Sequence, residues 1–239
     1  MQLQSNYDQH VELSKKLKMH EDYTNVRAPY KEDFEAIYDK AKDSDVSMSN
    51  AKDFLNSLTK DELRTLQNYT RLADEIDVGK LNEEGAYNLL LHHYEKFDFN
   101  NDGIVSDGLA QTQTMLPANM PYEDKKVLVE TLNDMSDKDR FMGMMLINPP
   151  KFRFENGQIL PGNNSDKVIT YEKIMENVQR IITPPPGAYS SPELKSIFAM
   201  FKTSYAENYE KMQEQKAQNS FAKSNELQAV KAKIQSQTA

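Results

Sequence analysis

Apolar side chains recur at helical spacing through most of this 239-residue sequence, and this periodicity limits the possible folds more than any other feature. Many of the periodic stretches begin with proline or with a residue that can cap a helix N-terminus. Thr59 and Glu62 have the spacing of a capping box, Pro29 and Pro121 can each occupy the first turn of a helix, and Ser49 is a further candidate cap. The sequence therefore predicts a mainly α fold composed of several helices.

The best candidate boundary in the chain is the stretch TPPPG, from Thr183 to Gly187. Three consecutive prolines make it stiff and non-helical. Ser191 and Pro192 follow and should begin a long C-terminal helix, whose residues beyond Met212 have too few apolar anchors to pack on a core. The expected units are N-terminal helices over residues 1–48, a helical core over 49–183, and a Pro-rich linker with a long helix over 184–239.

The composition argues against several kinds of function. A formal net charge of -8 does not suit a protein that neutralises nucleic-acid phosphates, which requires a basic surface. The chain has no cysteine, so thiolate chemistry and Cys-ligated metals are excluded. No apolar stretch is long enough to cross a membrane, and the N-terminal residues lack the pattern of a signal peptide. A cytoplasmic protein is the default expectation, with export that needs no cleaved signal left open.

One polar segment, KFDFNNDGIVSDG from Lys96 to Gly108, interrupts the helical pattern. Oxygen-bearing side chains alternate along it, which is what a loop needs if it is to place about six or seven hard oxygens around one Ca²⁺. Further oxygens would come from a backbone carbonyl, from a hydroxyl or bridging water, and from the nearest following acid. The candidate metal ligands are Asp98, Asn100, Asp102, Ile104 (through its carbonyl), Ser106 and Asp107.

This segment resembles the calcium loop of an EF-hand, which has polar ligands at positions one, three and five, a glycine at six and an apolar residue at eight. The matching residues are Asp98, Asn100, Asp102, Gly103 and Val105. Residues 83–97 have the apolar spacing of an entering helix, with Asn82 as its cap, and the match spans about thirty residues with that helix. Glu83 and Glu84 fall in its first turn, where the helix dipole alone accounts for acidic residues.

The resemblance fails at the twelfth position, where an EF-hand has a glutamate that binds Ca²⁺ through both carboxylate oxygens and this chain has Leu109. The loss of two oxygens and one charge implies one weak site for Ca²⁺, with Mg²⁺ as the second candidate ion. Water or a distant carboxylate would have to complete the shell. If the missing ligand is the defect, Leu109→Glu should tighten calcium binding.

EF-hands usually occur in pairs whose loops share a short β contact, so a partner segment can be sought. Residues 162–173 fit a degenerate, ion-free loop, with Lys173 where a carboxylate belongs. The competing partner is the β-like stretch IDVGKL, residues 76–81, whose end could contact Ile104 and Val105. The sequence leaves both choices open.

These patterns predict a non-enzymatic calcium-binding protein that acts as a structural stabiliser or adaptor and has a protein partner. Phosphate-binding glycine loops, nucleophile elbows and HExxH motifs are absent from the sequence. The alternative is an ion-independent interaction protein that docks through its C-terminal helix, with the polar segment forming Asx turns that hold no ion. Neither the oligomeric state nor the identity of the partner follows from the residues.

Overall fold

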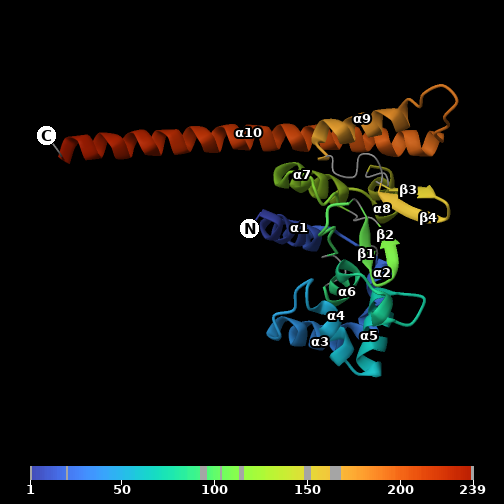
Figure 1. Cartoon of the computed structure of the whole chain (residues 1–239). Helices are drawn as coiled ribbons and strands as arrows, with labels where there is room; N and C mark the ends of the chain where they lie inside the picture. Colours follow the sequence, from blue (N-terminus) through green and yellow to red (C-terminus); the bar gives the residue numbers. More distant parts are fainter. Residues whose placement is uncertain are drawn as a thin grey trace.

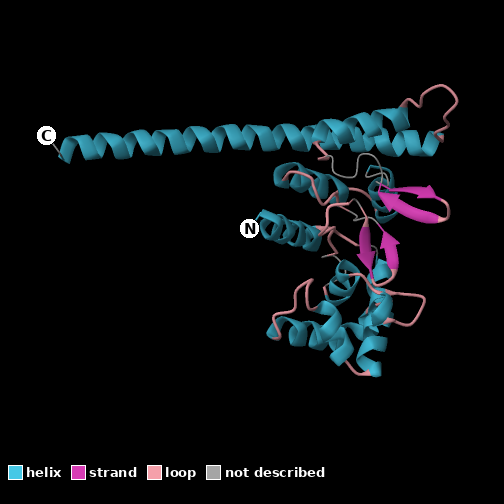
Figure 2. Ribbon diagram, viewed as in Figure 1, coloured by secondary structure: helices cyan, strands magenta, loops and turns pink. Residues whose placement is uncertain are grey.

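The computed structural model describes residues 2–19, 21–91, 96–102, 104–112, 116–147, 152–161 and 168–237. It is mainly helical, with two short β-hairpins in this part of the chain and a long C-terminal helix, which confirms the expected fold class (Figures 1 and 2). The helices are α1 (Gln2–Lys16), α2 (Glu21–Asn25), α3 (Lys31–Asp43), α4 (Ala51–Ser57), α5 (Lys60–Thr70), α6 (Glu83–Leu90), α7 (Tyr122–Asn133), α8 (Asp137–Ile147), α9 (Tyr171–Ile182) and α10 (Pro192–Gln237), with short 3-10 helices η1 (Ala28–Tyr30) and η2 (Val78–Lys80).

Two groups of helices contain most of the hydrophobic core (Figure 1). In the first group, α3 to α6 pack together, and the rings of Phe34 and Tyr69 stack with centroids 3.9 Å apart. In the second group, α1 and α7 to α9 surround the buried aromatic side chains of α10. A smaller cluster of Tyr7, Leu91 and Phe97 links α1 of the second group to the end of α6 in the first. The polar loop therefore begins where the two groups meet.

Helix caps occur largely where the sequence predicts them. Thr59 and Glu62 form the expected capping box at the start of α5. At the start of α10, the Ser191 hydroxyl accepts a hydrogen bond from a backbone N–H of the first turn at 3.2 Å. The expected cap at Ser49 is wrong by one residue, because Asn50 occupies the N-cap position of α4 while its side chain accepts a bond from a preceding backbone N–H at 2.7 Å.

The entering helix is shorter than predicted, because α6 ends at Leu90 and Leu91 is extended. Residues 92–95 lie outside the described part of the chain. The Asn88 side chain accepts a bond from the Phe97 N–H and donates one to the Phe97 carbonyl, both at 3.1 Å. A continuous helix would place Phe97 about 13 Å along the axis from Asn88. These two bonds therefore place Phe97 beside α6 and not beyond its end.

The predicted β-like stretch over residues 76–81 is also wrong, since residues 78–80 form the 3-10 helix η2. The Asp77 carboxylate accepts a bond from the Gly79 N–H at 3.1 Å and so caps η2. In contrast, the Asn156-Gly157 pair, a dipeptide typical of tight hairpin turns, forms such a turn. These residues join β3 (Phe152–Glu155) to β4 (Gln158–Pro161) with φ values of 52° and 77°, which is the turn that suits a two-residue hairpin.

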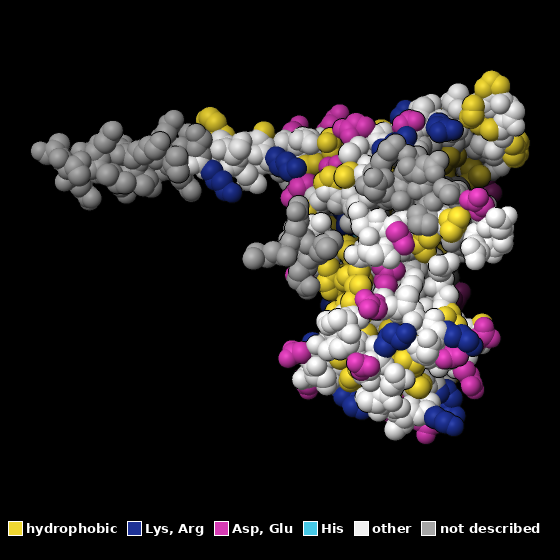
Figure 3. Space-filling model, in the orientation of Figure 1, with side chains coloured by type: hydrophobic (Ala, Val, Ile, Leu, Met, Phe, Trp, Pro, Cys, Tyr) yellow, Lys and Arg dark blue, Asp and Glu magenta, His cyan; other side chains and the backbone are white. Residues whose placement is uncertain are grey.

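The C-terminal helix α10 is 46 residues long, and its first part packs on the second group of helices. There the ring of Tyr209 stacks on Tyr171 of α9 with centroids 3.7 Å apart. Met212 is the last buried residue of α10 among those whose side chains are described, and residues 213–223 are exposed, as the sequence predicts (Figure 3). Among the described residues, no helix combines the length and the apolar character of a membrane span.

Candidate metal site

Polar side chains from α6 and its cap hold both ends of the loop. Asn82 caps α6 by accepting a bond from the Gly85 N–H at 2.6 Å, and its amide donates to the Ser106 hydroxyl at 3.0 Å. Asn88, which already binds the backbone of Phe97, also donates to the Ser106 carbonyl at 2.8 Å. The start of the loop and the strand that follows it are therefore fixed to the same helix.

Glu84 is a site residue that the sequence analysis missed. Its side chain is 3% exposed, and its two carboxylate oxygens accept bonds from the backbone N–H groups of Phe99 at 2.7 Å and Ser106 at 2.8 Å. The helix dipole alone accounts for an acid in the first turn of a helix, so Glu84 does not stand out in the sequence. The available signal was the spacing of Glu84 and Asn88, because residues four apart lie on the same face of a helix and both precede a polar loop.

The electrostatics of Glu84 connect it to the first predicted ligand. Burial raises the pKa of Glu84, and the nearby charge of Asp98 raises it further, while backbone N–H groups of Ser106, Phe99 and Asn100 oppose the change. Asp98 is itself buried. Within the described residues, no lysine or arginine forms an ion pair with Glu84. Two buried carboxylates thus interact at the loop, and a bound cation would offset the cost of burying both charges.

The alternating side chains of the loop bond to its own backbone. The Asp102 N–H donates to Asn100 Oδ1 at 2.8 Å and to Asp98 Oδ1 at 3.1 Å, and the Ile104 N–H donates to Asp102 Oδ1 at 2.8 Å. These Asx-type bonds curl the chain around the three side chains. In these bonds the Asp98 and Asp102 carboxylates each accept through their Oδ1 atom. The geometry is compatible both with a calcium loop and with an ion-free polar turn, and Gly103 lies outside the described residues.

Asp107 is directed elsewhere. Successive side chains of a strand point to opposite faces, and Ser106 faces Asn82, the N-cap of α6, so Asp107 points to the opposite face of β1. Asp107 forms a buried ion pair with Lys96, and its Oδ1 atom has no hydrogen-bond partner in the described structure. Asp107, the last of the predicted ligands, is therefore paired with a lysine in this structure.

The loop ends in a β-hairpin, and in the described part of the chain the next helix, α7, begins at Tyr122. The strand β1 (Val105–Asp107) pairs with β2 (Ala110–Thr112), and Leu109 lies in the turn between them with 52% of its surface exposed. The turn is fixed to α6, since the Gly108 N–H donates to the Gly85 carbonyl at 3.0 Å. A glutamate at residue 109 would thus project from the tip of the hairpin, which changes the expectation for Leu109→Glu.

Neither segment predicted as the partner of the loop pairs with β1 in the described structure, because β2 occupies that position. Residues 162–167 of the first candidate segment lie outside the described residues. Thr170 of that segment is the N-cap of α9, where its hydroxyl accepts a bond from the Lys173 N–H at 3.4 Å. The second candidate contains η2.

No group of three His, Cys, Asp or Glu side chains in the described part of the chain gathers as a metal-binding cluster. A calcium loop also uses amide, hydroxyl and carbonyl oxygens, so the set to consider is Asp98, Asn100 and Asp102 together with Glu84. No family model matches the chain, and no curated protein and no solved structure is found to be similar to it. Its function is therefore inferred from the chemistry of this loop.

Proposed function

We propose that the loop from Lys96 to Asp107 binds one hard cation, Ca²⁺ in preference to Mg²⁺, in a non-enzymatic protein that acts as a calcium-stabilised structural element or adaptor. The observation that carries this proposal is the buried carboxylate of Glu84, which lies close enough to Asp98 for the two charges to interact. Burying two carboxylates together is costly, and a bound cation offsets that cost.

Glu84 would take the place of the glutamate that an EF-hand has at position twelve. A carboxylate has about four lone-pair sites, so Glu84 can accept its backbone bonds and still face a cation. The Asp98 and Asp102 carboxylates, the Asn100 side chain, the Ile104 carbonyl and Ser106 would supply the other oxygens. Ca²⁺ tolerates such an irregular set better than Mg²⁺, which requires near-octahedral geometry.

This arrangement favours a stabiliser over a switch. In a calcium sensor, the ion draws the twelfth-position glutamate and moves the helix that follows the loop. Here Glu84 is already held by Phe99 and Ser106 and lies on the helix that precedes the loop. Binding would therefore raise stability by mass action, with little movement of the helices.

Asp98→Asn is expected to weaken calcium binding about tenfold or more, because it removes one charge from the shell. Isothermal titration calorimetry of the full chain with Ca²⁺, and in parallel with Mg²⁺, measures this change. Asp74→Asn is a suitable control, because Asp74 is an exposed acid outside the loop. This variant should bind calcium with the affinity of the wild type. A wild-type protein that gives no binding heat at millimolar calcium would refute the proposal.

A second candidate function is ion-independent docking through α10. The observation in its favour is the exposed stretch over residues 213–223, which carries the exposed aromatic side chain of Phe221. This function predicts no response to calcium, and a protein partner whose binding is lost when residues 213–239 are removed. The calcium titration of the wild type therefore distinguishes the two candidates.

A further inference from the structure

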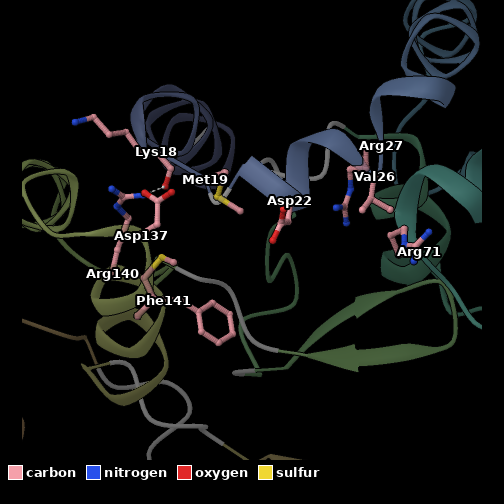
Figure 4. A pocket seen from close by; sticks show the side chains of 10 residues that line it. Lys18, Met19, Asp22, Val26, Arg27, Arg71, Asp137, Arg140 and Phe141 are labelled. Carbon is pink, nitrogen blue, oxygen red and sulfur yellow. Dashed lines mark hydrogen bonds and ion pairs between the residues drawn. The ribbon is translucent and has the colours of Figure 1, made fainter. Parts of the chain in front are cut away.

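A cavity of about 450 Å³ lies away from the polar loop, at the junction of the two groups of helices (Figure 4). Its wall is formed by α2 and the residues on either side of it, by α8, and by Arg71 at the C-terminus of α5. Cavities of roughly 300–1,000 Å³ are typical of small-molecule sites, which often lie between structural units. Both the size and the position of this cavity therefore suit a small ligand.

Much of the lining is apolar and accessible to solvent. Met19, Val26, Phe141 and Met144 all contribute to the wall. Val26 is 41% exposed and Phe141 is 51% exposed, and the two side chains come from opposite sides of the cavity (Figure 4). Isolated exposed apolar side chains are common, but these line the same concave surface. A ligand with an apolar body would cover them.

The charged lining is cationic, although the whole chain has a net charge of -8. Four lining side chains are basic and two are acidic; they are Lys18, Arg27, Arg71, Arg140, Asp22 and Asp137. Arg140 is already used, since it donates to the carbonyls of Leu132 and Met135 and to Asp137, each at 2.9 Å. Of the other basic side chains, Lys18 donates to the Asn133 carbonyl at 3.0 Å, and Arg27 and Arg71 lie at the other end of the cavity (Figure 4).

At that end, Arg27 and Arg71 lie on the same side of the cavity, next to Val26 (Figure 4). Arg27 is buried and Arg71 is exposed. In the described structure the Arg71 guanidinium forms no side-chain hydrogen bond or ion pair. A guanidinium presents parallel N–H groups that match a carboxylate or a phosphate. This end of the cavity thus offers a donor set for an anion.

We propose that the cavity binds a small amphiphile with an apolar body and one terminal anionic group. The anion pairs with Arg71 beside Arg27, and the body lies over Met19, Phe141 and Met144. The contrast between a cationic cavity and an acidic protein selects an anionic ligand over a neutral molecule of the same shape. The ligand contacts both groups of helices, so its binding also stabilises their packing.

The proposal is tested with sodium decanoate as the probe, on the full chain labelled with ¹³C at its methionine methyl groups. The Met19 and Met144 signals should shift on titration, while the signal of Met212, buried in the core around α10, should not. Decanol has the same body without the charge and should bind about tenfold more weakly. Decyl phosphate serves as a second anion, and its affinity relative to decanoate identifies the preferred head group.

Matched variants separate the role of the charge from that of the apolar wall. Arg71→Gln should weaken decanoate binding about tenfold and leave decanol binding unchanged, whereas Arg64→Gln, on the exposed surface of the same helix, should change neither. Val26→Asp should weaken both ligands, and Val168→Asp, at another exposed valine, should weaken neither. Methionine signals that do not move at millimolar decanoate would overturn the proposal, and so would full affinity in both Arg71→Gln and Val26→Asp.

Discussion

Gly85→Ala is expected to lower the free energy of unfolding by about 3 kcal/mol. A Cβ atom at residue 85 would lie 2.3 Å from the Gly108 carbonyl oxygen, which is far closer than atoms can approach. Gly108 cannot move away freely, because its N–H donates to the Gly85 carbonyl at 3.0 Å and its backbone packs against Leu72. The substitution must therefore separate the hairpin turn from α6. Chemical denaturation measures the loss.

Gly143→Ala provides the matched control, since Gly143 also lies within a buried part of a helix. A Cβ atom there would lie 3.4 Å from the nearest atom of the Leu132 side chain, which is close to an ordinary contact. Alanine favours a helix over glycine by about 1 kcal/mol, so this variant should be as stable as the wild type or more stable. A Gly85→Ala protein with wild-type stability would show that the close approach of α6 and the hairpin is not required.

The protein is expected to lose stability steeply in acid because of His10. Its ring is buried beside Lys125 and packs against Phe97 with ring centroids 5.1 Å apart. Burial, and then the charge of Lys125, lower the pKa of His10 from 6.5 to about 3. Between these two pH values the unfolded chain binds a proton that the folded protein does not. The free energy of unfolding should therefore fall as the pH decreases from 6.5 to 3, by about 1.4 kcal/mol per pH unit.

Denaturation of wild type and His10→Gln at pH 6.5 and at pH 4 isolates this contribution. Glutamine does not titrate and retains an acceptor for Lys125, so the variant should lose less stability over the same interval. Between pH 6.5 and pH 4, the free energy of unfolding should fall by about 3 kcal/mol more in the wild type than in His10→Gln. The carboxylates of the chain protonate to the same extent in the wild type and in His10→Gln, so their effect on stability cancels in the comparison. Parallel pH profiles would show that His10 is not kept neutral by its surroundings.

Local patterns predicted those parts of the fold that local chemistry determines. The capping box at Thr59 and the helix start at Ser191 and Pro192 depend on residues close in sequence, and both were found. The end of α6 could not be predicted in this way. The apolar spacing of residues 83–97 continues through Phe97, but Phe97 contacts Tyr7 of α1, with ring centroids 5.6 Å apart. An aromatic residue that completes a helical pattern can equally well fill a tertiary cluster.

In the candidate metal site, too, some features depend on residues close in sequence and others on tertiary contacts. The alternation of Asp98, Asn100 and Asp102 predicted a curled polar loop, because these side chains bond to backbone N–H groups only a few residues away. The direction of the chain after the loop depends instead on the close contact between Gly108 and α6. Glu84 lies outside the motif, so no spacing rule for the loop could include it. Its place beside the loop depends on the packing of α6 against the loop backbone at Phe99 and Ser106.

Calorimetric measurement of the calcium affinity of Glu84→Gln tests most directly whether Glu84 completes the metal site. Glu83→Gln is the matched control, because Glu83 is the adjacent acid in the same turn of α6 and is exposed. The expected result is binding about tenfold or more weaker in Glu84→Gln and unchanged in Glu83→Gln, with no tightening in Leu109→Glu. Wild-type affinity in Glu84→Gln, together with tighter binding in Leu109→Glu, would contradict the claim that Glu84 completes the site. The missing ligand would then belong at residue 109, the twelfth position of the loop.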